Sequence, residues 1–134
     1  MKERYCVNVR DIPNASLDKA EGWRMNIKWL LNRHTVGCES ACLFHATFRP
    51  GAAHEKHKHT NADEVVFVVS GKGAHGQGEE EWEVGPGDAY FVPRGMVHWG
   101  RATDPADPFV VVGAYIGVGS LEESGYAFVE RLEP

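Results

Sequence analysis

Residues 51–71 have the sequence GAAHEKHKHTNADEVVFVVSG, in which a histidine-rich segment directly precedes an apolar one. His57 and His59 stand two positions apart, and alternate side chains of a β-strand point to the same face. Their imidazoles are therefore expected to project together, about 6–7 Å apart along the backbone. Glu64 opens the apolar run Val65–Val69, where a buried carboxylate needs a partner or a metal ion. This stretch predicts a metal site at the start of a strand.

A second turn further along the chain offers one more ligand. His98 follows Pro93–Gly95, a turn that could direct its imidazole back toward the first three side chains. Three imidazoles and one carboxylate form a mixed nitrogen and oxygen set, which leaves two positions open around an octahedral ion. Ca and Mg prefer shells made of oxygen alone. We therefore expect one divalent transition metal (Fe, Mn, Ni, Co, Cu or Zn), although a histidine-rich loop on its own is often only exposed surface.

The rest of the chain has the pattern of an all-β protein. Fifteen glycines and seven prolines fall between short apolar runs, which is typical of strands joined by tight turns. Val65–Val69 is apolar at every position, as in a strand that is covered on both faces. No segment of ten or more residues has a helical period, so a sandwich or barrel is predicted. Strands are expected at about 25–31, 38–48, 57–60, 64–70, 89–92, 97–99 and 109–118, with a hairpin tip at 76–78.

Size and composition indicate one domain in a soluble protein. A chain of 134 residues fits a single domain, with an arm at about 1–24, a barrel at about 25–118 and a tail at about 119–134. The net charge of −5 argues against a nucleic-acid partner and weakly against an anionic membrane. No run of residues is apolar enough to cross a bilayer, so no membrane partner is expected.

Two further features bear on location. Residues 1–5 lead into no apolar segment, so no secretory signal is expected. Cys6, Cys38 and Cys42 are odd in number and form no CxxC pair, which favours reduced thiols in a cytoplasmic protein.

Both histidine-bearing stretches resemble the conserved motifs of the cupin superfamily. Fifteen residues separate them, a spacing similar to that of bacterial single-domain cupins. The resemblance implies a double-stranded β-helix (the cupin jelly-roll barrel), a metal near its centre held by His57, His59, Glu64 and His98, and a homodimer. One position departs from the pattern, because Ala102 stands where the family has asparagine, which puts local packing there in doubt. The matching positions are Gly51-x5-His57-x-His59-x4-Glu64-x6-Gly71 and Gly87-x5-Pro93-x-Gly95-x2-His98.

Other polar side chains are candidates for moving protons beside the metal. By strand alternation Glu55 shares the inner face with His57, unless it lies in a surface loop. His45 either faces the barrel interior or is a structural histidine, and His75 either faces the cavity or the outside. His54, next to Glu55, is a weaker candidate. Several aromatic residues are expected mostly in the core, with one or two lining the pocket: Tyr90, Phe91, Trp99, Trp29 and Tyr115.

Three classes of function remain open at this point. The resemblance favours a metal-dependent enzyme acting on a small, oxygen-bearing organic molecule, by dioxygenation or by isomerase, lyase or cyclase chemistry. The alternative is a non-catalytic module that binds or senses a metabolite. A storage or purely structural jelly roll is the third class. The fold does not decide among them.

Overall fold

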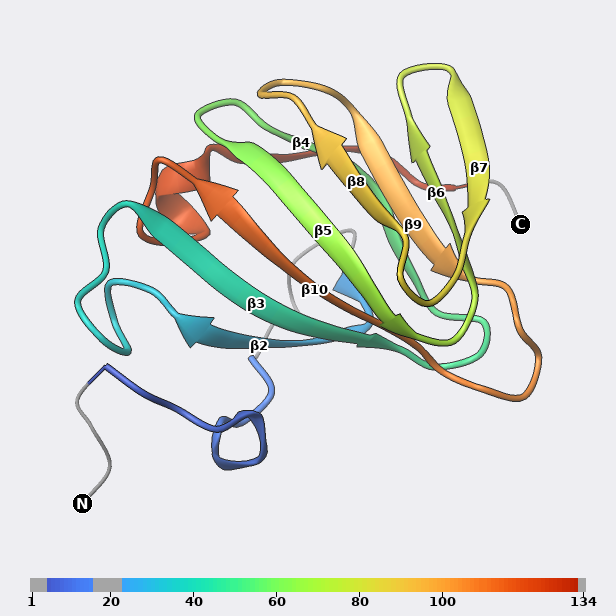
Figure 1. Ribbon diagram of the computed structural model, residues 1–134. Helices are drawn as coiled ribbons and strands as arrows, with labels where there is room; N and C mark the ends of the chain where they lie inside the picture. Colours follow the sequence, from blue (N-terminus) through green and yellow to red (C-terminus); the bar gives the residue numbers. More distant parts are fainter. Residues whose placement is uncertain (1–4, 16–22, 133–134) are drawn as a thin grey trace.

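Two antiparallel β-sheets face each other across a shared core in the computed structural model, which describes residues 5–15 and 23–132 (Figure 1). The six-stranded sheet has the order β1 (Trp23–Arg24), β4 (Ala53–His59), β9 (His98–Ala102), β6 (Gly73–Gln77) and β7 (Glu80–Val84), with β11 (Tyr126–Glu130) also paired to β4. The five-stranded sheet has the order β2 (Asn26–Leu31), β3 (Ala41–Phe48), β10 (Phe109–Ile116), β5 (Asp63–Ser70) and β8 (Ala89–Val92).

Short 3₁₀ turns are the helical part of the described chain. They are η1 (Val9–Asp11) and η2 (Glu122–Ser124). The predicted all-β class is confirmed, because strands form both layers and close around one core. No helix among the described residues is long and apolar enough to cross a membrane.

Strand alternation places the core between the two sheets. In β3, the side chains of Cys42, Phe44, Ala46 and Phe48 are buried and the residues between them are partly exposed. This pattern with a period of two directs one face of β3 toward the six-stranded sheet. The inner faces of both sheets therefore form the walls of any cavity that lies between the sheets.

The outer face of β5 departs from the sequence prediction. The run Val65–Val69 was expected to be covered on both faces, yet Val65, Phe67 and Val69 are 41%, 51% and 47% exposed. Only Val66 and Val68 point into the core. The run is apolar on both faces, but in the described chain only one face is covered.

The connection between β4 and β5 brings the histidine-rich segment face to face with the apolar segment that begins at Glu64. Because β4 belongs to one sheet and β5 to the other, residues 60–62 carry the chain from one layer to the next. Backbone hydrogen bonds hold this connection, from Thr60 N–H to the Gly125 carbonyl (3.2 Å) and from Asn61 N–H to the Ser124 carbonyl (2.9 Å).

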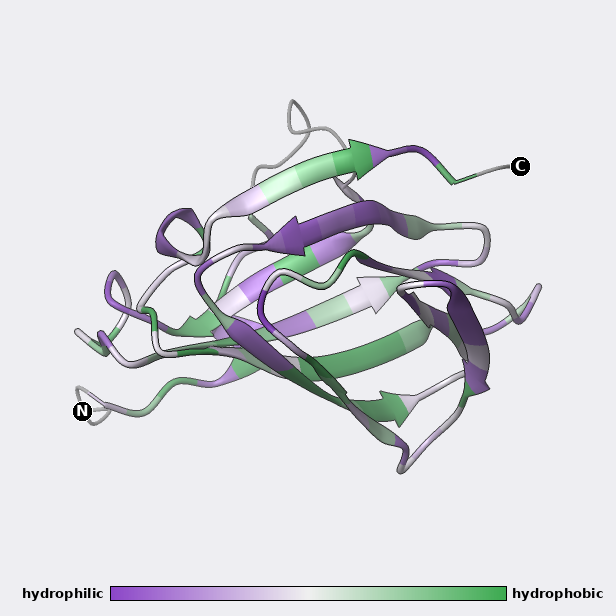
Figure 2. Ribbon diagram, turned by 90° about the horizontal axis from the view of Figure 1, so that it is seen from above, coloured by the Kyte–Doolittle hydropathy of each residue, from purple (hydrophilic) through white to green (hydrophobic). Residues whose placement is uncertain are grey.

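Part of the segment 119–132 belongs to the six-stranded sheet. These residues were expected to form a tail, whereas η2 contacts the β4–β5 connection and β11 pairs with β4 from Tyr126 opposite His59 to Glu130 opposite Lys56. Figure 2 shows β11 beside β4, whose hydrophilic residues colour it purple. A polar strand such as β4 is held by backbone pairing on both edges, with β9 on the other side.

Candidate metal centre

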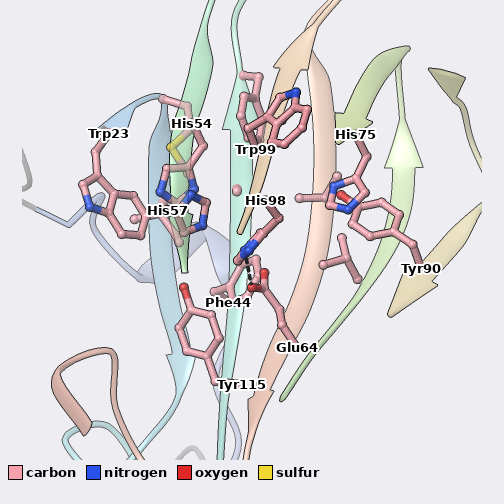
Figure 3. A pocket seen from close by; sticks show the side chains of 17 residues that line it. Trp23, Phe44, His54, His57, Glu64, His75, Tyr90, His98, Trp99 and Tyr115 are labelled. Carbon is pink, nitrogen blue, oxygen red and sulfur yellow. Dashed lines mark hydrogen bonds and ion pairs between the residues drawn. The ribbon is translucent and has the colours of Figure 1, made fainter. Parts of the chain in front are cut away.

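His57, His59, Glu64 and His98 meet at one point between the sheets. Their ligand atoms all lie within 4.8 Å of one another, and all four side chains are buried. His57 and His59 extend from β4, and His98 lies directly opposite His57 on the neighbouring strand β9. Glu64 approaches from β5 in the facing sheet (Figure 3). The group therefore spans both layers of the fold.

The turn before His98 is tied to both strands of the first motif. Gly95 donates its N–H to the His59 carbonyl (2.9 Å), and Arg94 donates its N–H to the Asp63 carboxylate (2.8 Å). Gly95 has a φ of 79°, a left-handed conformation that glycine adopts without a steric cost. These bonds explain how a residue distant in sequence comes to lie beside the other three.

The Nδ1 atom of each of the three imidazoles forms a hydrogen bond with an oxygen atom of the chain. His57 Nδ1 lies 2.6 Å from the Glu55 carbonyl, and His98 Nδ1 lies 2.9 Å from the Met96 carbonyl. His59 Nδ1 lies 2.9 Å from the hydroxyl of Ser124, which itself donates to the Leu121 carbonyl (2.6 Å). Because these oxygens act as acceptors, each Nδ1 carries the proton. The Nε2 lone pairs of the neutral rings are left for the interior, as in metal-ligating histidines.

The contacts of these Nε2 atoms fit a bound cation. His98 Nε2 lies 3.0 Å from Glu64 Oε1, and His59 Nε2 lies 3.4 Å from the same oxygen. With Nδ1 protonated, a neutral His98 would turn a lone pair toward a carboxylate, which is unfavourable unless a proton or a cation lies between them. His59 Nε2 is buried and makes no hydrogen bond within the described chain. A divalent ion would satisfy the carboxylate and both nitrogens together.

The protonation states of these side chains at neutral pH also suit metal binding. Burial lowers the pKa of His57 well below its usual value, and the neighbouring histidines lower it further. Burial lowers the pKa of His59 to about 4, although the nearby Glu64 opposes this shift. For Glu64, burial alone would raise the pKa, but the neighbouring imidazoles, His98 foremost, favour the carboxylate anion, and the pKa is lowered overall. Neutral imidazoles and an ionised carboxylate are the forms that bind metals.

A cavity of about 40 Å³ adjoins the centre and is lined by three of its four side chains, His57, Glu64 and His98. The far wall of this cavity is the side formed by the five-stranded sheet. It is apolar and includes Phe44, Val66 and Val111. Tyr115 also comes from that sheet and points its hydroxyl toward the same space (Figure 3). Burial raises the pKa of Tyr115 well above its usual value, so its phenol stays neutral and can donate a hydrogen bond.

Aromatic rings form a continuous row along the near wall of this cavity. Successive ring centroids are 4.0, 3.6, 4.0, 6.3 and 3.8 Å apart. The two central rings belong to the candidate metal centre, and one further imidazole flanks it on each side (Figure 3). The row consists of Trp23, His54, His57, His98, His75 and Tyr90.

His75 lines the cavity. Its ring stacks on Tyr90, and its Nε2 atom lies 2.8 Å from the side-chain oxygen of Gln77. Because an amide oxygen accepts, Nε2 donates and Nδ1 is left as the acceptor of the ring. Burial lowers the pKa of His75 to about 4, despite the opposing hydrogen bond to Gln77, so the ring is neutral near pH 7.

Glu55 does not face the cavity, and His54 takes the place predicted for it. A β-bulge sets Glu55 and Lys56 opposite the single residue Trp99, since His54 pairs with Gly100 and His57 with His98. The extra residue breaks the strict alternation on which the prediction rested. The Glu55 carboxylate instead accepts hydrogen bonds from Arg24 (3.2 Å) and from the N–H of Leu132 (3.0 Å).

His45 is also not brought to the site. In β3, Phe44 and Ala46 line the cavity, so alternation puts His45 on the outer face of the sheet with Leu43 and Thr47. These three residues share a face as predicted, but alternation in the sequence does not show which face of the strand is buried.

The remaining predictions about the walls are partly confirmed. Tyr90, Tyr115 and Trp99 line the cavity, whereas Phe91 is 53% exposed. Trp29 packs against the core. Ala102, where the motif has asparagine, is buried, and its N–H donates to the Ala52 carbonyl (3.1 Å).

Some residues near the centre gave no signal in the sequence. Ser124 lies 65 positions from His59, the residue it contacts, and no motif links the two. Gln77 was assigned to a hairpin tip. His54 was a weaker candidate, because strict alternation without the bulge would turn its side chain away from the cavity.

Comparisons with known proteins agree with this architecture. The chain is 28% identical over 104 residues to germin-like protein subfamily 2 member 4 of Arabidopsis thaliana; this covers 67% of the chain but only 42% of that relative. An uncharacterized conserved protein with a double-stranded β-helix domain from Klebsiella pneumoniae has a similar structure. Its TM-score is 0.71 at 20% identity, covering 96% of this chain and 100% of that one.

A structure of oxalate oxidase is also similar, with a TM-score of 0.73 at 18% identity, covering 93% of this chain and 63% of that one. At such identities the likeness concerns the fold alone. The sequence profile of the cupin domain matches residues 44–115, which is more than half of the chain and includes both histidine-bearing motifs. This match, together with the double-stranded β-helix, shows that the chain belongs to the cupin family.

Proposed function

We propose that this protein is a metal-dependent enzyme that acts on a small, oxygen-bearing organic molecule. One observation carries the proposal: three imidazoles with oriented Nε2 atoms and one carboxylate converge within 4.8 Å beside a cavity. Four protein ligands leave two positions of an octahedral shell free for a substrate. A divalent transition metal bound there would act as a Lewis acid or bring dioxygen next to the substrate.

The side chains around the centre have distinct parts in this proposal. His57, His59, Glu64 and His98 hold the ion, and the carbonyls of Glu55 and Met96 keep two of the rings in place. His75 offers an acceptor nitrogen in a neutral ring, so it can accept a hydrogen bond from a hydroxyl group of the substrate. The apolar far wall limits the access of bulk water, which strengthens polar contacts inside.

Metal content is the direct test of this proposal. Protein produced without a histidine tag should contain or take up one divalent transition metal per chain, measured by elemental analysis and by titration calorimetry. His98→Ala should lose this binding, because one of four ligands is removed. His45→Ala, which removes an imidazole from the outer face, should keep it. Equal metal content in all three proteins would contradict the proposed ligand set.

Turnover distinguishes the enzyme from a binding or sensing module. Metal-loaded protein should consume oxygen, or convert its substrate without oxygen, with at least one member of a panel of catechols, 1,3-diketones and hydroxy acids. Saturable binding without any conversion would instead assign the protein to the binding class.

The outer face of the five-stranded sheet supports a homodimer as part of this proposal. Its exposed residues include Phe67 and Phe91, and the surface around them is lined without a charged side chain. Two copies of such a face can meet about a two-fold axis without charge repulsion. The side chains that alternation directs to this outer surface are Leu43, Val65, Phe67, Ala89, Phe91, Val112 and Ala114.

We also propose a reducing compartment, the cytoplasm, as the location of the protein. Cys6, Cys38 and Cys42 are all free thiols. Burial raises the pKa of Cys42 to about 12, which keeps this thiol protonated and unreactive.

A further inference from the structure

The charged groups that line the cavity determine which net charge a ligand can carry there. Within the described residues that line the cavity, Glu64 is the sole acidic group, and no lysine or arginine takes part. A divalent ion bound by three neutral imidazoles and one carboxylate carries a single net positive charge. One negative charge on the ligand would therefore neutralise the centre, and a second would remain unbalanced in an apolar surrounding.

Three cations on the strands around the site are already paired with carboxylates that do not line the cavity. On β1, Arg24 lies 3.2 Å from Glu55, and on β4, Lys56 lies 3.2 Å from Glu130. On β9, Arg101 lies 2.7 Å from Glu81. Alternation puts Arg24 and Arg101 on the face opposite to the cavity-lining residues Trp23 and Gly100. These three cations are thus committed to other carboxylates.

His54 offers a polar contact that nothing in the described chain uses. Its ring lies between Trp23 and His57, with centroids 4.0 and 3.6 Å away, and it lines the cavity. Its Nε2 atom is buried and has no hydrogen-bond partner among the described residues. A buried polar atom without a partner is costly, so a ligand atom that bonds to it would be favoured.

The size of the cavity limits the ligand further. Its volume is about 40 Å³ on a scale where one water molecule needs about 10–15 Å³. That space suits a molecule of a few non-hydrogen atoms.

We propose that the ligand of this site is a small monoanion that places its single charge at the metal and an uncharged polar group against His54, and that dicarboxylates are excluded. This inference rests on the proposed metal centre and narrows its substrate class. Exclusion follows from the lack of a cation for a second carboxylate, and His54 supplies the hydrogen bond that an amide, hydroxyl or ketone can complete.

Oxalate, oxamate and oxamide provide a matched test, because they share one planar shape and carry two, one and no negative charges. Calorimetry on the metal-loaded wild type should find that oxamate binds at least about tenfold more tightly than oxalate, since the second buried charge is uncompensated. Oxamide should also bind more weakly than oxamate, because it leaves the positive charge unbalanced. Oxalate binding that equals or exceeds oxamate binding would overturn the inference.

The contact with His54 is tested by His54→Phe, which keeps an aromatic ring in the stack and removes both nitrogens. Oxamate should bind about fivefold more weakly to this variant, with metal content unchanged. His45→Phe on the outer face is the matched control and should bind oxamate like the wild type. Unchanged affinity in His54→Phe would refute the contact.

Metal content separates the two levels of the proposal. If the wild type takes up no metal, the proposed function fails and the inference falls with it. If metal binds and oxalate is preferred, the metal centre stands and only the ligand class is wrong. The comparison of charges in the wild type needs no variant, so a misfolded His54→Phe would leave it valid.

Discussion

Ser124 shows how single side chains outside the ligand set control the centre. Its hydroxyl accepts from His59 Nδ1 (2.9 Å) and donates to the Leu121 carbonyl (2.6 Å), so the hydroxyl can act only as an acceptor toward the imidazole. This fixes the tautomer of His59 and leaves Nε2 free for the ion. His57 and His98 obtain the same orientation from backbone carbonyls, which substitution cannot remove.

Ser124→Ala should therefore weaken metal binding while the four ligands remain. Loss of such a partner costs about tenfold to a hundredfold in metal affinity. Ser70→Ala, at an exposed position of β5, is the control and should bind metal like the wild type. The measurement is the dissociation constant for Zn or Co by competitive titration. An affinity unchanged in Ser124→Ala would show that His59 does not need this hydroxyl.

Buried neutral histidines predict acid sensitivity of the metal-free protein. Burial holds the pKa of His59 and of His75 at about 4 in the folded state, against 6.5 for the free side chain. Between these values the unfolded chain binds protons that the folded chain does not, so stability decreases as the pH falls. Each histidine contributes up to about 1.4 kcal/mol per pH unit in this window.

Below about pH 4.5, Glu64 adds to this loss, because its pKa is lowered in the folded state and its stabilising contribution disappears on protonation. Urea denaturation of chelator-treated protein at about pH 7, 6 and 5 measures the effect as the free energy of unfolding. His75→Phe should reduce the dependence on pH. A free energy that stays constant over this range would contradict the assigned pKa shifts.

Among the elements, β10 packs closely against its two neighbours in the five-stranded sheet, β3 and β5. Gly113 lies in the middle of β10, opposite Phe44 on β3 and Val66 on β5. A Cβ atom at this position would lie 2.5 Å from Phe44 Cζ and 2.7 Å from the Val65 carbonyl oxygen. Phe44 and Val66 line the cavity, so the packing of this strand also shapes the site.

Gly113→Ala should destabilise the fold, because the backbone oxygen of Val65 cannot move without disturbing the β5–β10 pairing. Overpacking of this kind costs about 1–3 kcal/mol. Gly85→Ala is the control, since a Cβ atom there meets nothing within 4 Å. Thermal and urea unfolding compare the two variants. Equal stability of both would mean that β10 can shift to admit a methyl group.

At the level of the whole molecule, the two sheets differ in polarity and contribute different parts of the site. The six-stranded sheet supplies three of the four converging side chains, and its strand β4 is hydrophilic (Figure 2). The five-stranded sheet supplies Glu64, the apolar far wall of the cavity and an exposed apolar outer face. The site lies where the polar face of one layer meets the apolar face of the other.

The proposed homodimer gives a prediction at this scale. Wild-type protein should sediment with the mass of two chains, and the double variant Phe67→Asp, Phe91→Asp should sediment as one, because charges would be buried without partners. Val129→Asp, an exposed apolar position on β11 in the other sheet, is the control and should remain dimeric. A monomeric wild type, or a dimeric double variant, would place the dimer elsewhere or remove it.

The layered all-β fold was predictable from local patterns, whereas the grouping of His57, His59, Glu64 and His98 also required the resemblance of the two motifs to those of the cupins. Glycine and proline turns mark the strand ends. His57 and His59, two positions apart, point to the same face as expected because the strand is regular around them. Glu55 was misplaced because one inserted residue reverses alternation, and a bulge depends on the pairing of β4 with β9. Neighbouring residues alone do not encode that pairing.

Long-range packing alone decided the rest. Three features arise only when separate strands meet. One is the stacking of His54 and His75 at the two ends of the imidazole row, and another is the contact of the Ser124 hydroxyl with His59. The third is the side of β3 that becomes buried, which carries Phe44 and not His45. Local sequence specifies which residues share a face, because the backbone repeats every two residues. Which face becomes the interior depends on where the second sheet lies, and that is a property of the assembled molecule.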